Sequence, residues 1–162
     1  MEDRDDTERF LDWLAGFIDG EGCFIIGAGD AIRFRCCIAL RDDDSDAIRY
    51  IHRKLGFGSI YHQKAQKGAP LLGWHVNGPK NCTKLATLLN DRLRTKKRRD
   101  FLIWSAALEA KAAGAGFQTL RSYKEALEAG RRYRAKRQRV ECPTYPQLRL
   151  IRENEDATSI CG

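Results

Sequence analysis

The spacing of apolar residues predicts an amphipathic helix near the start of the chain. Its apolar positions recur at the i, i+3, i+4 and i+7 spacing of one helix face, and they are Phe10, Leu11, Leu14, Phe17 and Ile18. Thr7 or Asp6 can cap its start, and Gly20 and Gly22 end it. We therefore expect a helix that runs through residues 9–18.

The period then changes from that of a helix to that of a strand. In the segment 33–41 the apolar positions alternate with arginines: Phe34, Cys36, Ile38 and Leu40 on one face, and Arg33, Arg35 and Arg41 on the other. Shorter segments predict further strands at 23–26, 58–64 and 71–77, with polar turns at 27–30 and 64–68.

Helical patterns separate and follow these strands. An acid-rich stretch from Asp42 begins a second helix, whose stripe is Ile48, Ile51, His52 and Leu55. Pro79 opens a third, with an apolar side made of Leu85, Leu88, Leu89 and Leu93. Two more are expected around 101–111 and near 119–138. The large aromatic residues at inward positions are interpreted as core: Trp13, Trp74, Phe101 and Trp104.

The predicted order is α-β-β-α-β-β-α, with extra helices at the C-terminal end. Hairpins separated by helices are typical of an α+β fold, in which helices cover one face of an antiparallel sheet. A chain of 162 residues is long enough for one core. We therefore expect one domain over 1–140 and a tail over 141–162 without assigned structure.

The face of this sheet turned away from the helices is expected to carry donors and aromatic rings: Arg33, Arg35, Ser59, Tyr61, Gln63, His75 and Asn77. Such residue types read base edges and contact phosphates, and acids are absent from these positions. An ordinary solvated face explains any one of these residues equally well. Taken together, the set favours nucleic acid.

The charge of the chain is basic and unevenly distributed. The net charge is +7, but the first 12 residues hold six acids and two bases, which leaves +11 for the remainder. A basic body favours a polyanion or an anionic membrane face as partner. Two runs, 92–99 and 131–139, hold six bases each, and they are read either as solvated helix faces or as phosphate contacts.

Neither a membrane span nor secretion is expected. No apolar run approaches 18 residues, and the acidic start does not resemble a signal peptide. The six cysteines form no C-x-x-C pair and match no zinc spacing, so free thiols are favoured over a metal or disulfide framework.

The segment Leu14–Gly22 is unusual for a soluble helix, because Gly16 and Gly20 lie four residues apart inside it. Each internal glycine costs about 1 kcal/mol relative to alanine. That cost makes sense where a second helix backbone approaches closely. Two copies packed about a two-fold axis would bring two Glu21 carboxylates together, and paired carboxylates favour Mg²⁺. The competing interpretation is a core helix that ends at a glycine beside a solvated Glu21.

This segment resembles the LAGLIDADG motif of homing endonucleases. It matches at Leu14, Ala15, Gly16, Ile18, Asp19 and Gly22, with Phe17, Gly20 and Glu21 as variants known in that family. The order of elements, the turn over residues 55–60 and the Leu-x-x-Lys run at 93–96 extend the resemblance to about residues 8–112. The motif occurs once, so the chain is similar to the homodimeric, single-motif members.

The resemblance implies roles for particular residues. Glu21 would bind the metal, assisted by the Gly20 carbonyl, and Asp19 would brace the helix end. Lys96 would stand near the scissile phosphate, with Lys97 and Arg94 as substitutes, and Arg41 would orient water. Lys97 is also counted with the DNA-binding residues. The dimer interface would be formed by residues of the motif helix: Leu14, Ala15, Gly16, Phe17, Asp19 and Gly20.

The resemblance implies a homodimer that makes a double-strand break in a long, pseudo-palindromic DNA site. The cofactor would be Mg²⁺, with Mn²⁺ as a substitute, and the protein would work inside the cell, in the compartment that holds its target genome. Two alternatives use the same fold without cleavage: an RNA-splicing maturase, with intron RNA as partner, and a transcription regulator.

Overall fold

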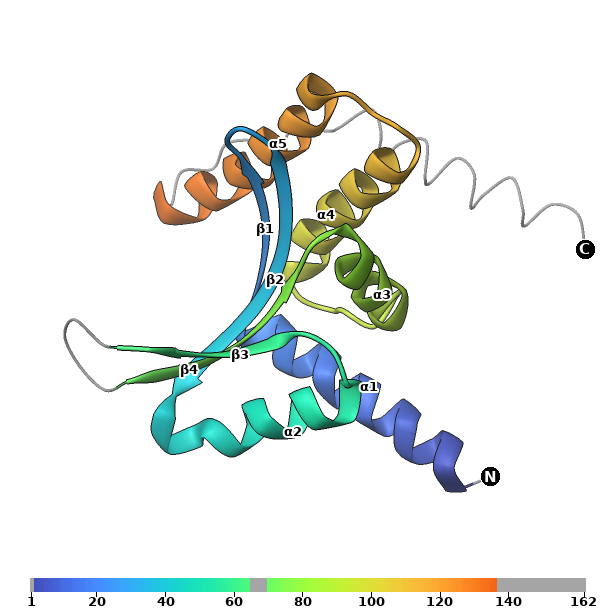
Figure 1. The fold of residues 1–162 in the computed structure, drawn as a ribbon, viewed down its shortest axis with the longest axis vertical. Helices are drawn as coiled ribbons and strands as arrows, with labels where there is room; N and C mark the ends of the chain where they lie inside the picture. The colour runs from blue at the N-terminus through green and yellow to red at the C-terminus, as the bar shows by residue number, and fades with distance from the viewer. Residues whose placement is uncertain (1, 65–69, 137–162) are drawn as a thin grey trace, which may run out of the picture. The chain divides into compact units, whose positions relative to one another are not determined.

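The computed structural model describes residues 2–64 and 70–136, and the side chains within 5–64 and 70–131. The elements in chain order are α1 (Glu2–Glu21), β1 (Gly22–Ala28), β2 (Ile32–Arg41), a 3₁₀ turn (Asp42–Asp44), α2 (Ser45–Leu55), β3 (Ser59–Gln63), β4 (Leu71–Asn77), α3 (Pro79–Leu89), α4 (Lys97–Ala112) and α5 (Phe117–Lys136). The predicted order is confirmed (Figure 1). One compact unit extends to Ala129, and a second begins at Gly130.

The four strands form one antiparallel sheet in the order β1-β2-β4-β3. In its register Gly22 lies opposite Ile38, Arg35 opposite Asn77, and Ser59 opposite His75. The strands curve along their length, and α1, α2, α3 and α4 pack against the sheet (Figure 1). The prediction of an α+β fold with a helix-covered antiparallel sheet is therefore confirmed.

The core lies between the sheet and these helices, and the strand alternation determines which residues enter it. Phe34, Cys36 and Ile38 of β2 are buried, as are Leu72, Trp74 and Val76 of β4. Burial of large apolar side chains is the main favourable term in folding. The two-residue period read from the sequence is therefore the pattern that builds the core.

The helix α1 begins at Glu2, well before the predicted start at residue 9. Ion pairs hold its first turns: Arg9 with Asp5 at 2.6 Å within the helix, and Lys54 of α2 with Asp6 at 2.6 Å. Acids in a first helical turn also interact favourably with the helix dipole. Asp6 and Thr7, which were predicted as possible caps, therefore lie inside the helix.

Two glycines are required by close packing. A Cβ on Gly22 would lie 2.6 Å from Ile18 Cγ2 and 2.7 Å from the Ile18 carbonyl oxygen, so only glycine lets α1 pass directly into β1. Gly58 has a φ of +87°, and a Cβ there would lie 2.4 Å from Trp74 Nε1. That ring nitrogen donates to the Phe57 carbonyl at 3.1 Å, which fixes the turn into β3.

Two expectations about core residues need correction. Leu93 is buried as predicted, but α3 ends at Leu89, so Leu93 packs from the connecting segment instead of the helix. Trp13 is 40% exposed and is not a core residue, because it lies on the side of α1 away from the sheet. There it stacks on Phe17 with ring centroids 5.2 Å apart and meets Tyr50 edge-on.

Some expectations lie outside the described residues: most of the 64–68 turn, the 141–162 tail and the end of the second basic run. Within the described part of the chain, no helix combines the length and apolar character needed to cross a bilayer.

Candidate functional site

The C-terminal end of α1 presents oxygen donors to solvent. Glu21 is its last residue and is exposed, and Gly20 beside it is exposed as well. The last turn contains no basic residue, so the carboxylates lie at the negative end of the helix dipole without compensation from within the helix. Carboxylate and carbonyl oxygens are the ligands that Mg²⁺ prefers, so these residues fit a hard divalent cation. Among the described residues, no group of three or more His, Cys, Asp or Glu side chains is arranged to hold a metal.

The Asp19 carboxylate is occupied by another segment of the chain. Its oxygens accept hydrogen bonds from the Arg94 N–H at 2.8 Å, from Thr95 Oγ1 at 2.8 Å and from the Thr95 N–H at 3.3 Å. These bonds tie the segment between α3 and α4 to the end of α1. Asp19 thus connects the end of α1 to this segment.

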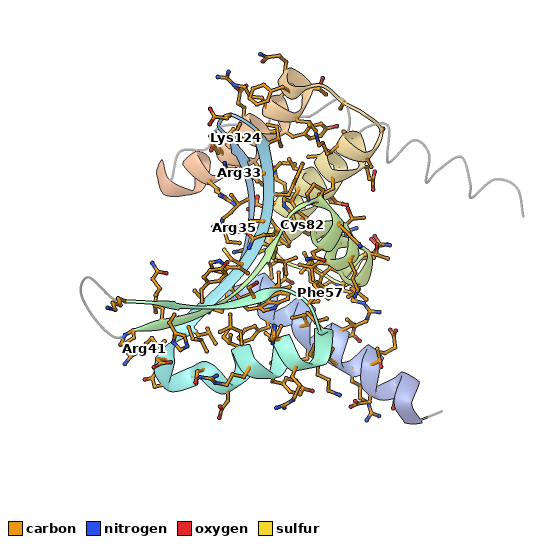
Figure 2. The ribbon with its side chains drawn as sticks, in the orientation of Figure 1. Arg33, Arg35, Arg41, Phe57, Cys82 and Lys124 are labelled. Carbon is orange, nitrogen blue, oxygen red and sulfur yellow. The ribbon has the colours of Figure 1, made fainter. Side chains whose placement is uncertain are left out.

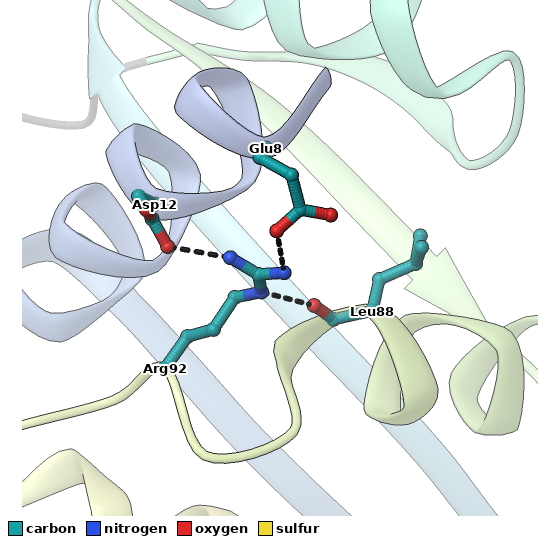
Figure 3. A network of polar contacts seen from close by, with 4 residues as sticks. All are labelled: Glu8, Asp12, Leu88 and Arg92. Carbon is teal, nitrogen blue, oxygen red and sulfur yellow. Dashed lines mark hydrogen bonds and ion pairs between the residues drawn. The ribbon is translucent and has the colours of Figure 1, made fainter. Parts of the chain in front are cut away.

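Arg92 makes a second tie between the same segment and α1 (Figure 3). Its Nη1 donates to Asp12 at 2.5 Å, its Nη2 to Glu8 at 2.6 Å and its Nε to the Leu88 carbonyl at 3.1 Å. The hydrogen bond to Glu8, followed by that to Asp12, raises the pKa of Arg92. Arg92 is the first residue of the basic run 92–99, and it is therefore a structural tie instead of a solvated or phosphate-facing charge.

The remaining bases of that run surround the start of α4. Arg94 and Lys96 are exposed, and Lys96 is the N-cap of the helix. The half-buried Lys97 donates from Nζ to the Gly22 carbonyl, directly after Glu21. Lys97 therefore lies at the α1–β1 junction and not on the sheet face. Basic residues in the first turn of a helix interact unfavourably with the positive end of the helix dipole. This cluster therefore slightly destabilises the start of α4.

The outward face of the sheet carries the seven residues that the alternation places there. Arg33, Arg35, Ser59, Tyr61, Gln63 and Asn77 are exposed and His75 is half-buried. In β2 and β4 the residues between them, such as Phe34 and Val76, are buried in the core, whereas β3 contributes no buried residue. Figure 2 shows Arg33 and Arg35 along β2, with Cys82 among the helices. None of the four strands contains an acid. The arginines of the strands therefore give this face positive charge that no carboxylate within the strands offsets.

Two side-chain pairs organise this face. Arg35 Nε donates to Asn77 Oδ1 at 2.7 Å, and the Tyr61 and His75 rings stack with centroids 4.6 Å apart. Burial, and then the charge of Arg35, lower the pKa of His75. His75 is therefore neutral at neutral pH.

Arg41 lies at the end of β2, beside the start of α2 (Figure 2). Gly22, the residue after Glu21, lies opposite Ile38 in the sheet. Arg41 is three residues beyond Ile38, a separation of about 10 Å along the strand. Its ion-pair partner is Asp43 at 3.2 Å. The structure does not bring Arg41 together with Glu21.

The helix α1 has one face in the core and one face open. Leu14 and Ala15 are 0% and 1% exposed within the single chain, so their side chains belong to the subunit's own core, and their part in a dimer interface stays a prediction. A Cβ placed on Gly16 or Gly20 meets nothing within 4 Å outside the helix itself. A helix presents successive residues about 100° apart, so Leu14 and Gly16 cannot share a face. The open stripe is Trp13, Gly16, Phe17 and Gly20.

The hydrogen bonds that Arg92 and Thr95 donate to residues of α1 were not predicted from the sequence. Arg92 stands among five other bases and Thr95 is a lone hydroxyl, so no local pattern distinguishes either of them. Their partners on α1 are 76 to 84 positions away. Only the folded chain shows these contacts.

Comparisons with known proteins agree with the fold described above. The model of the LAGLIDADG endonuclease family matches residues 14–108. "Probable intron-encoded endonuclease 4" of Neurospora crassa is 28% identical over 100 residues, which is 61% of this chain and 18% of that protein. "Intron-encoded RNA maturase bI4" of Saccharomyces cerevisiae is 30% identical over 95 residues, 59% of this chain and 14% of that protein.

Among solved structures, the LAGLIDADG meganuclease I-AabMI bound to uncleaved DNA matches with a TM-score of 0.57 and 28% identity, over 64% of this chain and 37% of that one. The chain thus spans less than a fifth of each of the two curated relatives. The family match runs from the second half of α1 through the whole sheet into α4, which is more than half of the chain. The chain belongs to the LAGLIDADG endonuclease family.

Proposed function

We propose that the protein is a site-specific DNA endonuclease that works as a homodimer and requires Mg²⁺. The observation that carries this proposal is the open glycine face of α1, which ends at the exposed carboxylate of Glu21. The family membership and the acid-free sheet face support it. The target is a long, pseudo-palindromic double-stranded site in whichever genome the protein meets.

A second copy of the chain completes the site in this proposal. Gly16 and Gly20 leave space for a helix backbone to approach, and a two-fold axis beside them brings two Glu21 carboxylates together. Each sheet then covers one half-site of about one helical turn, so the full target is roughly 20 base pairs. The interface uses Gly16, Phe17 and Gly20, with Asp19 engaged in its own subunit.

Different residues of the chain bind the metal and contact the scissile phosphate. Glu21, with the Gly20 carbonyl, would hold the cation, and Mg²⁺ bound there would supply an activated water and stabilisation of negative charge on the departing oxygen. Lys96 presents an ammonium group to the scissile phosphate, supported by Arg94. The bonds from Asp19 to Thr95 fix the backbone that carries Lys96. Arg41, which is paired with Asp43 at the far end of β2, is given no part in this site.

The sheet face supplies recognition. Arg33, Arg35 and the polar residues of β3 and β4 lie in the major groove, which a two-stranded ribbon or a curved sheet can enter. The bases near α4 add phosphate contacts that release counterions, so the affinity should fall steeply with salt. The half-buried Lys97, bonded to the Gly22 carbonyl, contributes positive charge near the Glu21 end.

The test is cleavage of a randomised double-stranded library by the full chain in the presence of Mg²⁺. We expect double-strand products from wild type, and a loss of about 10²- to 10³-fold in Glu21→Gln. The matched control is Glu109→Gln, an exposed acid on α4, which should cut at the wild-type rate. Library binding without metal reports recognition separately. Full cutting by Glu21→Gln overturns the assignment of Glu21, and an absence of cuts by wild type overturns the endonuclease.

A second candidate is an RNA maturase without nuclease activity, favoured by the resemblance to the yeast protein named as an intron-encoded RNA maturase. In that case structured intron RNA should bind more tightly than any DNA in the library, with no cleavage. Competition between labelled RNA and DNA distinguishes the two functions directly. Removal of divalent metal should abolish cutting in the first and leave RNA affinity unchanged in the second.

A further inference from the structure

Arg35 and Asn77 form a preorganised pair on the outward face of the sheet. They lie directly opposite each other on β2 and β4. The Gly78 N–H donates to the Phe34 carbonyl at 3.1 Å, which marks the two residues as a non-hydrogen-bonded pair of the antiparallel ladder. In such pairs the side chains are closer than at hydrogen-bonded positions. Arg35 Nε reaches Asn77 Oδ1 at 2.7 Å, and both residues are exposed.

This bond determines which hydrogen-bonding atoms remain available. Arg35 keeps the four N–H groups of Nη1 and Nη2, which form the outer edge of its planar guanidinium. Asn77 has committed its carbonyl oxygen. An asparagine that reads adenine needs that oxygen to accept from the base amino group while its own amide donates to N7. Asn77 could read adenine while it holds Arg35 only if both lone pairs of this oxygen were engaged at once, so the Arg35 bond competes with that role.

The neighbouring side chains leave the guanidinium edge open. The His75 ring folds over Gly73, where an added Cβ would lie 3.0 Å from its Nε2, and it stacks on Tyr61. The strands offer no carboxylate that could bind Arg35. The pair thus presents mainly donors, the four N–H groups of Nη1 and Nη2 and the two of the Asn77 amide, against one remaining lone pair on Asn77 Oδ1. Guanine is the base that shows two acceptors, O6 and N7, side by side in the major groove, whereas cytosine offers a donor.

We propose that Arg35 reads one guanine in each half-site and that Asn77 is its positioning residue. This inference rests on the proposed function, because it assumes that the sheet face enters the major groove. Asn77 holds the guanidinium plane in one orientation before DNA arrives, so less side-chain freedom is lost on binding. Asn77 makes no specific base contact of its own.

The experiment measures base preference at every position by binding of the full chain to a randomised double-stranded library without divalent metal. We expect a guanine preference of about 10- to 100-fold at one position of each half-site. Arg35→Ala should remove it. Asn77→Ala should reduce it about three- to tenfold at that same position. Arg33→Ala, a matched exposed arginine two residues away on the same face, should leave that guanine preference unchanged.

Asn77→Asp separates positioning from direct contact. Aspartate still accepts from Arg35 Nε, so the guanine preference should persist, while its added negative charge weakens binding to every sequence alike. Loss of an adenine preference in Asn77→Ala, or a guanine preference indifferent to both residues, overturns this inference while leaving DNA recognition intact. If wild type enriches no sequence at all, the proposed function fails and this inference fails with it.

Discussion

The two faces of the sheet are built from alternate residues of the same strands, yet they follow different rules. The inward face is filled by side chains such as Phe34, Ile38 and Trp74, which are almost completely excluded from water. The outward face carries Arg33, Arg35 and Tyr61, which no other part of the described chain covers. Volume and shape determine the first face, and charge and hydrogen-bonding capacity determine the second. A substitution should therefore affect stability on one face and recognition on the other.

The helix α1 repeats this division on a smaller scale. Leu14 and Ile18 are buried against the subunit's own core, whereas Gly16 and Gly20 face open space. The inward residues of α1 hold it to the sheet. Trp13 and Phe17 on the open stripe stack on each other, whereas Gly16 and Gly20 contact nothing in the single chain, so their small size is explained by the approach of a partner helix.

The largest expected effect is on the inward face. Trp74→Ala should lower the free energy of unfolding by about 3–5 kcal/mol, because it leaves a cavity and removes the bond to the Phe57 carbonyl. Denaturant titration measures this loss. Tyr61→Ala, on the outward face and 48% exposed in wild type, is the control. It should change stability by less than about 1 kcal/mol while weakening DNA binding. Equal losses of stability in the two variants would contradict the division between faces.

The open face of α1 is tested by adding volume to it. Gly16→Leu should raise the stability of the subunit by up to about 1 kcal/mol, since leucine is a better helix former and meets no neighbour. The same side chain should weaken dimerisation by about tenfold or more, measured by sedimentation equilibrium. Gly116→Leu, at a glycine with equally open surroundings before α5, should leave the dimer intact. An unchanged dimer in Gly16→Leu would remove α1 from the interface.

The adjacent cysteines of β2 allow the two faces of the sheet to be compared at neighbouring positions in the sequence. Cys36 is buried and Cys37 is half-exposed on the outward face. Burial raises the pKa of the Cys36 thiol. Burial also raises the pKa of Cys82, to about 12, and a hydrogen bond with Cys23 raises the pKa of Cys37. A maleimide at neutral pH should still modify Cys37 about tenfold faster than Cys36, since Cys36 must wait for the fold to open.

Peptide mapping by mass spectrometry reads each site in that experiment, and denaturant should equalise the rates. Faster labelling of Cys36 than of Cys37 in the native protein would reverse the assignment of the faces.

The smallest expected effect is a pH dependence from His75. Its folded pKa lies below the ordinary value of 6.5, so its stabilising contribution is full above that pH and is lost as pH falls through the folded value. DNA phosphates act in the opposite sense, because a nearby negative charge favours the protonated ring. Lowering the pH from about 7.5 to about 5.5 should weaken the fold slightly and tighten DNA binding a few-fold.

Calorimetric unfolding and DNA titration at several pH values test these opposite signs. The change His75→Asn should remove both dependences, and a pH effect on affinity that survives in this variant would have to arise elsewhere on the face.

Much of the fold could be predicted because it depends on local patterns. The alternation in β2 identified both faces before any coordinate was known, and Gly16 and Gly20 singled out α1 as a helix with an unusual surface. The boundaries were less accurate where tertiary contacts decide them. The first turns of α1, from Glu2 on, include Asp6, which pairs with Lys54 of α2, and Leu93 is buried although it lies outside any helix.

The sequence by itself determined the order of elements, the inward and outward strand residues and the position of Glu21 at a helix end, because each of these follows from periodicity or from the φ preferences of nearby residues. Only the tertiary structure decided which side chains meet. Arg35 finds Asn77 across 42 positions, and Arg92 finds Glu8 across 84. It also decided that Leu14 and Ala15 belong to the core while Gly16 stays open. A helix with apolar residues on more than one side carries no local signal of which side its own sheet will cover, and that choice is made by packing.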